Sequence, residues 1–321
     1  MDQLHTLISD LDLEIELLAN LKNRSIEQKQ QYIGAGANAY YESRKMQRPF
    51  FKGGLSGEDY TNFIKSYFFQ NNQPATSTII SLGCGNASKE KTLLLSSTDL
   101  DINYIGVDSS KEMLDIAKQE LEAIEIKKQF ICADFSSYNF RQELSSITKQ
   151  NHPRIFAFLG STIGNIPLTH IVDTLYNMLL PEDVLWLDVA ARPDKSSETD
   201  ITIFKHYTQY LEQKEYTDFQ YSLLNNLGIP LATGEFTLQM IKEDAVGALK
   251  FQFGFLFKER VKISLRNESV TFLPGEQMDV GHIRVYDVPS LEKFFWEHEF
   301  ECIASEIKGN KAQLLFRKAK K

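Results

Sequence analysis

Residues 77–86 read STIISLGCGN, an apolar, β-branched run that breaks into a glycine-rich turn. Such a run predicts a buried strand, and helix-compatible residues follow the turn. Gly83 would allow the sharp turn, and Gly85 would let bare backbone approach a ligand at the helix start. The stretch therefore predicts a cofactor-binding strand–turn–helix unit. It lacks the third glycine of the dinucleotide fingerprint, so a purely structural turn stays an alternative.

A second apolar strand, residues 102–108 (INYIGVD), ends in an acid. Asp108 follows the glycine turn near the offset of roughly 20 residues at which such an acid accepts hydrogen bonds from a ribose diol. The next residues, SSKEMLDIAKQEL, carry apolar side chains at helical spacing. The alternative is that Asp108 only caps this helix, because Asp and Ser are common N-cap residues.

A third strand, residues 129–133, is followed by Asp134 and Phe135. An acid beside an aromatic ring suits adenine, because the carboxylate can accept the exocyclic amine while the ring packs against apolar surface. A helix cap with a core phenylalanine is the alternative here. The glycine turn, ribose acid and adenine acid in succession resemble the signature of class I S-adenosylmethionine-dependent methyltransferases.

Strands and helices alternate over residues 77–190, with further strands at 154–160 and 183–190. This alternation predicts an α/β fold with a doubly wound, Rossmann-like parallel sheet. In an open sheet that begins with its central strand, the residues after the fourth strand face the cofactor across the switch point. Residues 160–165 are therefore expected where a transferred group would emerge.

The composition argues against several other classes of protein. A net charge of -8 disfavours nucleic acid as the principal partner, which needs a basic face. The first 18 residues have no basic n-region and no window is apolar enough to span a bilayer, so neither a signal peptide nor a membrane anchor is predicted. Scattered histidines and three widely spaced cysteines indicate no metal site, no disulfide framework and a cytoplasmic location. The cysteines are Cys84, Cys132 and Cys302.

Two segments together, residues 82–92 (LGCGNASKEKT) and 158–167 (FLGSTIGNIP), closely resemble the histidine Nα-methyltransferases of ergothioneine biosynthesis and their relatives acting on amino-acid amines. The resemblance implies S-adenosylmethionine as the cofactor. It also implies a lysine near the cofactor's carboxylate; counting from Gly83 favours Lys89, and the Glu-Lys-Thr tripeptide favours Lys91. The cofactor-binding residues implied are Gly83, Cys84, Gly85, Lys89, Asp108, Ser109, Asp134, Phe135, Gly160 and Ser161.

The resemblance also implies how the chain is divided. Residues 1–75 would form an N-terminal segment, largely helical from Leu4 to about Phe69, that contributes to the substrate site. Residues 76–193 would form the cofactor-binding core, and 194–285 an inserted substrate-binding subdomain, with a helical stretch at 201–229 and strand-like runs after about residue 250. Residues 286–321 would complete the core with a helix and a strand.

Two catalytic residues follow from the resemblance. Asn165 would bind the substrate's carboxylate, and Tyr32, in the stretch YIGAGANAY, would hydrogen-bond its amine. A packing role for Tyr32 is the alternative. Tyr207 or Tyr210 would add a carboxylate contact. A second tyrosine of the family falls near Phe50 or Phe51, where the hydroxyl is missing.

The most informative departure lies in residues 272–286 (FLPGEQMDVGHIRVY). Family members that bind histidine carry Gly-Glu-x-Ile-x-x-Glu-x-Ser here, and an ungapped count puts Gly281 and Ile283 at the two imidazole contacts. Losing both would leave a wider, more apolar pocket. If the alignment slips by one or two residues, His282 or Asp279 could take the role.

The sequence therefore predicts an N-methyltransferase that acts on the amine of a small amino acid, or a related metabolite, other than histidine. Methylation of L-histidine and a non-catalytic S-adenosylmethionine-binding protein are the alternatives. A nicotinamide dehydrogenase is disfavoured by the missing third glycine and by Asp134 after the third strand.

Overall fold

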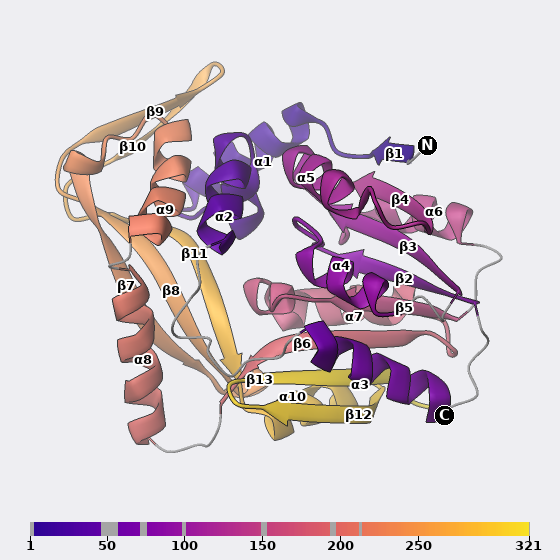
Figure 1. Ribbon diagram of the computed structural model, residues 1–321. Helices are drawn as coiled ribbons and strands as arrows, with labels where there is room; N and C mark the ends of the chain where they lie inside the picture. Colours follow the sequence, from indigo (N-terminus) through magenta and orange to yellow (C-terminus); the bar gives the residue numbers. More distant parts are fainter. Residues whose placement is uncertain are drawn as a thin grey trace.

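One large sheet organises the chain (Figure 1). The computed structural model describes residues 3–45, 57–70, 76–97, 101–148, 153–192, 197–211 and 214–320. Within them the sheet runs β1-β4-β3-β2-β5-β6-β11-β8-β7. Its parallel core consists of β2 (Thr76–Leu82), β3 (Asp101–Asp108), β4 (Lys127–Cys132), β5 (Arg154–Phe158) and β6 (Val184–Ala191). The switch point between β2 and β5 confirms the doubly wound α/β fold.

Helices cover both faces of this sheet. Side chains of α3 (Gly57–Gln70), α4 (Ser88–Leu95) and α5 (Lys111–Leu121) share one apolar cluster with one side of the strands. Side chains of α6 (Tyr138–Ile147), α7 (Leu168–Met178) and α10 (Val288–Glu297) share the cluster on the other side. The helical spacing read from the sequence holds in α5, which buries Met113, Leu114, Ala117 and Leu121.

The N-terminal segment begins with a strand, not a helix. β1 (Gln3–Thr6) pairs in parallel with β4 along the sheet edge, so the prediction of helix from Leu4 was wrong. Four residues with hydrogen bonds to a neighbouring strand cannot be recognised from helical spacing alone. A capping box at Ser9 then starts α1 (Asp10–Lys22), which is followed by the 3-10 helix η1 (Gln28–Tyr32) and α2 (Ala35–Lys45). Phe50 and Phe51 lie outside the described residues.

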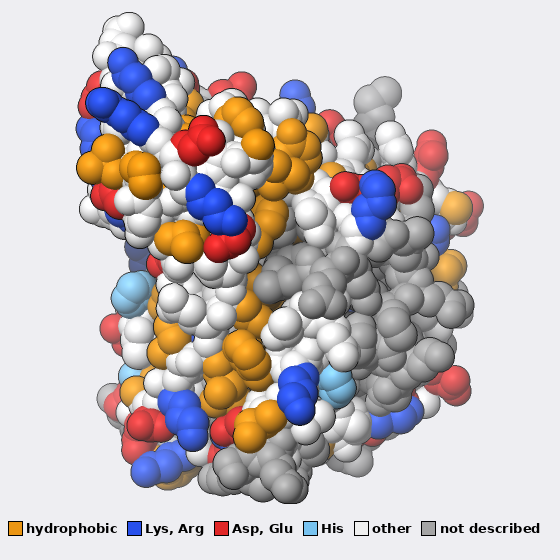
Figure 2. Space-filling model, turned by 90° about the vertical axis from the view of Figure 1, so that its left-hand side faces the viewer, with side chains coloured by type: hydrophobic (Ala, Val, Ile, Leu, Met, Phe, Trp, Pro, Cys, Tyr) orange, Lys and Arg blue, Asp and Glu red, His pale blue; other side chains and the backbone are white. Residues whose placement is uncertain are grey.

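Within the described residues, the segment from 197 to 286 adds two α-helices and five strands. The elements are α8 (Ser197–Leu211), α9 (Lys214–Asn226), β7 (Gly234–Glu243), β8 (Ala248–Phe257), β9 (Val261–Leu265), β10 (Glu268–Phe272) and β11 (Gln277–Tyr286). The predicted helical stretch is present as α8 and α9, whereas β7, which pairs along its whole length with β8, was not predicted. Figure 2 shows the face on this side of the molecule, where basic and acidic side chains are mixed among hydrophobic ones.

Two connections join these added elements to the core. β11 pairs with β8 and, at Val285 and Tyr286, also with the end of β6, so the sheet continues from the core into the added strands. The last hairpin, β12 (Phe300–Lys308) and β13 (Lys311–Lys318), then packs β13 antiparallel against β6. This pairing places Lys311 at the carboxyl end of β6. No helix within the described ranges is long and apolar enough to cross a membrane.

Candidate functional site

The glycine turn after β2 and the acid at the end of β3 are joined directly. Asp108 accepts hydrogen bonds from the N–H groups of Gly85, at 2.9 Å, and Ser110, at 3.0 Å. Burial raises the pKa of Asp108, and these N–H groups act in the opposite direction. Ser110, not Asp108, caps α5, because its hydroxyl accepts the Met113 N–H. Asp108 therefore lies at the glycine turn, as a ribose-binding acid would.

The turn itself strongly favours glycine at position 83. Its φ is +69°, and a Cβ there would lie 2.5 Å from Cγ2 of Thr162, in the loop after β5. The Thr162 hydroxyl in turn bonds the Gly83 carbonyl at 3.3 Å. The two loops that flank the switch point thus touch each other. Beside them, Cys84 is buried, and burial raises the pKa of its thiol well above the usual value.

We expect Gly83→Ala to weaken binding of S-adenosylhomocysteine about tenfold or more, because the new methyl group meets Thr162 and the backbone is strained at positive φ. In Gly83→Ala/Thr162→Ser the clashing methyl is gone and only the strain remains. Calorimetry should then show partial recovery of affinity. Equal affinities of the single and double variants would contradict the contact as the cause.

Lys89 and Lys91 have different surroundings. Lys91 Nζ pairs with Glu120 on α5 at 2.8 Å. Lys89 Nζ reaches the carboxyl edge of the sheet, where it bonds Asp188 of β6 at 2.6 Å and lies next to Gly160. The structure therefore favours Lys89 for the cofactor's carboxylate. Asp188 was not singled out from the sequence, although an acid within a fully apolar strand was a signal for a buried charged contact.

Asp134 lies after β4, as predicted, but it is already bound within the protein. Its Oδ1 accepts from the Ser136 N–H at 2.8 Å, and its Oδ2 accepts from Lys29 of η1 at 2.6 Å. Burial alone would raise the pKa of Asp134, but the charge of Lys29 brings it below its usual value. The neighbouring Phe135 packs edge-on against Phe158, with ring centroids 5.5 Å apart. An adenine amine would have to share Asp134 with Lys29.

Tyr32, at the end of η1, lies in an aromatic group. Its ring is 4.9 Å from that of Tyr40 and stacks on Phe219 at 5.6 Å, and its hydroxyl accepts from Gln28 at 3.4 Å. The Tyr32 carbonyl accepts the Ser110 hydroxyl at 2.7 Å, which ties η1 to the helix that follows Asp108. Tyr32 therefore both packs in the added subdomain and contacts the cofactor-binding half.

Residues 281 and 283 lie on β11 after a bulge between Asp279 and Gly281. Gly281 has φ +150°, and a Cβ there would be 2.8 Å from Nε2 of Gln31, which also bonds the Val280 carbonyl. The expected empty volume at position 281 was therefore wrong, because the Gln31 amide from η1 occupies it. Ile283 faces the apolar cluster that includes Tyr32.

His282 contacts both segments that contain the predicted catalytic residues, η1 with Tyr32 and the 3-10 helix that ends at Asn165. The backbone of Asn165, the last residue of η3 (Thr162–Asn165), hydrogen-bonds its imidazole, and the His282 N–H contacts Gln28 at 3.4 Å. Its Nε2 is buried without a hydrogen-bond partner among the described residues. Burial, with the charges of Arg284 and Lys250, lowers the pKa of His282 to about 3.

This depressed pKa predicts a loss of stability in acid. His282 ordinarily titrates at 6.5, so its contribution to stability is present above pH 6.5 and is lost as the pH falls toward 3. The loss should reach up to about 1 kcal/mol per pH unit, measured by urea unfolding. His282→Gln should make the free energy of unfolding less dependent on pH. His170→Gln, at an exposed position of α7, should leave the pH dependence as in wild type. Identical slopes in wild type and His282→Gln would contradict the assignment.

Of the remaining predicted residues, the two serines follow the carboxyl ends of β3 and β5, and the two tyrosines lie on α8. Ser109 follows Asp108, and Ser161 adopts φ +64° in the loop after β5. Tyr207 is 8% exposed and its ring packs 4.4 Å from that of Phe251, within the apolar cluster of the added subdomain. Tyr210 is on the same helix, α8, but its side chain is outside what the structure describes.

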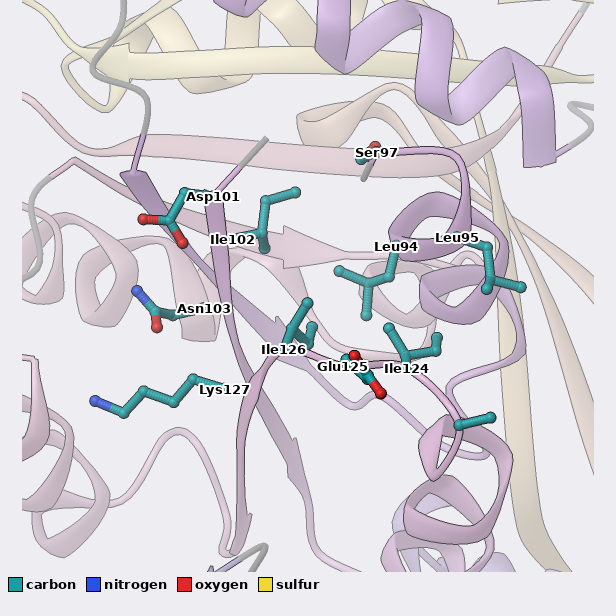
Figure 3. A pocket seen from close by; sticks show the side chains of 11 residues that line it. Leu94, Leu95, Ser97, Asp101, Ile102, Asn103, Ile124, Glu125, Ile126 and Lys127 are labelled. Atoms are coloured by element: carbon teal, nitrogen blue, oxygen red, sulfur yellow. The ribbon is translucent and has the colours of Figure 1, made fainter. Parts of the chain in front are cut away.

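A cavity of about 850 Å³ lies at the opposite edge of the sheet, where β3 and β4 begin (Figure 3). Leu94, Ile102 and Ile124 line it together with polar Asn103 and other residues. It is therefore distinct from the carboxyl-end site. Within the described part of the chain, no group of three or more His, Cys, Asp or Glu residues is placed to hold a metal ion.

Comparison with known proteins adds a family match. The family model for histidine-specific, SAM-dependent methyltransferases matches residues 60–312. The chain is 25% identical to carboxy-S-adenosyl-L-methionine synthase of Helicobacter hepaticus over 194 residues, which are 59% of this chain and 76% of that protein. It is 28% identical to the protein of the same name from Trichodesmium erythraeum over 199 residues, 61% and 72% of the two chains.

Solved structures align over most of the chain at low identity. An S-adenosylmethionine-dependent methyltransferase from Clostridium acetobutylicum gives a TM-score of 0.49 at 14% identity, covering 88% of this chain and 99% of that one. Magnesium protoporphyrin IX methyltransferase from Synechocystis gives 0.46 at 10% identity, covering 90% and 96%. The family match, in contrast, includes the glycine turn, Asp108, the loop after β5 and β11.

Proposed function

Since the chain belongs to the family of histidine-specific, S-adenosylmethionine-dependent methyltransferases, we propose that it methylates the amine of a small amino acid, or a related metabolite, other than histidine. The observation that carries this proposal is the surface of β11 at residues 281 and 283. Gly281 supplies no side chain there, and Ile283 supplies an apolar one. A site selective for imidazole needs hydrogen-bonding partners at such positions.

The surroundings of Gly281 support a neutral substrate side chain. Gln31 is 1% exposed, and its Oε1 has no hydrogen-bond partner among the described residues. Gln28 lies beside it, between Tyr32 and the backbone of His282. Carboxamides donate and accept hydrogen bonds without charge, and a buried Oε1 without a partner is costly, so these residues suit a neutral polar side chain with a donor better than an apolar one.

The residues at the carboxyl edge of the core fit the cofactor. Gly83 and Gly85 have positive φ and keep the turn free of side chains, Asp108 is fixed at that turn, and Lys89 lies beside Gly160. When bound there, S-adenosylmethionine supplies an activated methyl group on a sulfonium, so no nucleophilic side chain is needed.

The task of the protein is then to position a neutral amine. Holding reactants in line at near-attack distance lowers the barrier by several kcal/mol, on the order of 7 or more in well-oriented cases. Asn165 follows the loop at the switch point, and Tyr32 is tied to Ser110 through its carbonyl. We assign Asn165 to the substrate's carboxylate and Tyr32 to its amine. The phenol would accept a hydrogen bond from the amine and so orient its lone pair.

One observation favours L-histidine as a second candidate substrate. The bulge in β11 adds a residue before Gly281, which shifts the count of the imidazole contacts toward His282. The Nε2 of His282 is a buried nitrogen with no partner among the described residues, so it could meet a second imidazole.

The test combines binding and turnover. Calorimetry with S-adenosylhomocysteine establishes cofactor binding, and a panel of free amino acids that includes histidine is then titrated into that complex. Mass spectrometry should detect a methylated amine together with S-adenosylhomocysteine, and not a carboxylated cofactor. Tight binding of histidine would overturn the choice of substrate, and binding without any methyl transfer would indicate a non-catalytic protein.

A pair of variants examines the role of Gln31. Gly281→Glu alone should not bind histidine and should lose stability, because the new Cβ would lie 2.8 Å from Gln31 Nε2. Gln31→Ala/Gly281→Glu makes room for the carboxylate, although the backbone strain at φ +150° remains, and we expect its affinity for histidine to rise about tenfold over that of the single variant. The measurement is calorimetry with S-adenosylhomocysteine present. A gain in the single variant, or none in the double variant, would contradict this account of the pocket.

A further inference from the structure

A fully buried carboxylate at the carboxyl end of β6 collects groups from several parts of the chain. Asp188 is 0% exposed. Its Oδ2 accepts from Lys89 Nζ at 2.6 Å, from the Tyr60 hydroxyl at 2.6 Å and from the Gly160 N–H at 2.7 Å. Lys311 Nζ lies 3.8 Å from the other oxygen, Oδ1. These partners come from α3, α4, the loop after β5 and β13.

The charge of Asp188 is the centre of this cluster. An ionised carboxylate away from water is unfavourable unless cations and N–H donors surround it. Burial alone would raise the pKa of Asp188, but the charges of Lys311 and Lys89 hold it far below its usual range. The group is therefore ionised at neutral pH, and it draws two ammonium groups to one place.

That place is the turn that follows β5. Gly160 and Ser161 both have positive φ, at +80° and +64°. Lys311 donates a hydrogen bond to the Ser161 hydroxyl, and a Cβ on Gly160 would lie 3.7 Å from Lys89 Nζ. Lys89 is 22% exposed and Lys311 13%, so both reach from the buried carboxylate toward the surface of the site.

The cluster retains capacity to bind a ligand. An ammonium group has three N–H donors, and Lys89 gives one to Asp188 and one to Tyr60. We propose that Asp188 is a positioning residue for cofactor binding: it holds Lys89 and Lys311 at the turn after β5, where their ammonium groups receive the carboxylate of the cofactor's amino-acid end. This role is independent of the methyl acceptor.

The experiment compares two ligands that differ in that carboxylate. S-adenosylhomocysteine carries the amino-acid end, and 5′-methylthioadenosine lacks it but keeps the nucleoside. Lys311→Met and Lys89→Met should each weaken the binding of S-adenosylhomocysteine by about ten- to a hundredfold. The affinity of the same variants for 5′-methylthioadenosine should stay within about twofold of wild type. Asp188→Asn should show the same selectivity, because the lysines lose the charge that holds them. Lys311→Arg keeps a cation and should restore most of the affinity.

A matched control lies on the same helix as Lys89. Lys91→Met removes a lysine that pairs with Glu120 and should change neither affinity. Thermal unfolding of each variant shows whether it folds. If Asp188→Asn does not fold, the affinities of the two lysine variants still test the proposal. Wild-type affinity in Lys311→Met, or equal weakening of both ligands, would overturn the proposal. If the wild-type protein binds neither ligand, both this proposal and the use of S-adenosylmethionine are overturned. If it binds the ligands but methylates no amine, only the proposed function fails and the proposal for Asp188 stands.

Discussion

Asp108→Asn should raise the dissociation constant for S-adenosylhomocysteine about a hundredfold, because a buried charged acceptor is lost at the glycine turn. Asp108 accepts from the N–H groups of Gly85 and Ser110 with different oxygens. In asparagine one of those oxygens becomes an NH₂ group, which would face a backbone donor. The turn should then open, and the ribose should lose its carboxylate acceptor.

The two adenosine ligands separate this effect from that of Asp188. Both carry the ribose, so Asp108→Asn should weaken the binding of 5′-methylthioadenosine as strongly as that of S-adenosylhomocysteine, as measured by calorimetry. Asp101→Asn, at the exposed start of the same strand, is the matched control and should bind as wild type. Unchanged affinity in a folded Asp108→Asn protein would show that the charge of Asp108 contributes neither to the turn nor to ligand binding.

Asp183→Ala should lower the free energy of unfolding by about 3 to 5 kcal/mol, because it leaves the guanidinium of Arg154 buried without its counter-charge. Arg154 is 5% exposed and Asp183 0%. Their side chains bond at 3.1 Å through Nε, and the Arg154 N–H adds a bond at 3.2 Å. The pair joins the starts of β5 and β6, at the opposite end of these parallel strands from the loop that contains residues 160–165. Urea unfolding measures the loss.

An exposed ion pair provides the comparison. Lys214 Nζ and Asp218 Oδ2 on α9 lie 2.5 Å apart, but the two side chains are 81% and 54% exposed. The free energy of unfolding of Asp218→Ala should therefore equal that of wild type within error. Arg154→Met/Asp183→Leu removes both charges and should recover much of the loss, since no unpaired charge remains. A loss in the double variant as large as that in Asp183→Ala would mean that packing, and not the uncompensated charge, sets the cost.

The sequence by itself determined the doubly wound core and the position of its switch point. Apolar runs that end in Gly83, Asp108 and Asp134 define strand ends, and parallel strands bring those ends to one edge. Local signals were enough because each feature depends on residues close in the chain. The resemblance of the two segments at 82–92 and 158–167 was sufficient for the family, which the match over residues 60–312 confirms. The individual roles of the site residues stay predictions.

Only the tertiary structure decided what surrounds these residues. Gln31 reaches position 281 from 250 residues earlier in the chain, which a count along β11 cannot show. β1 is a strand only because β4 offers its edge, and Asp134 meets Lys29 across 105 positions. Asp188 gathers Tyr60, Lys89 and Lys311. A buried charge is stable only with partners, and spacing in sequence does not reveal partners that folding brings from distant segments.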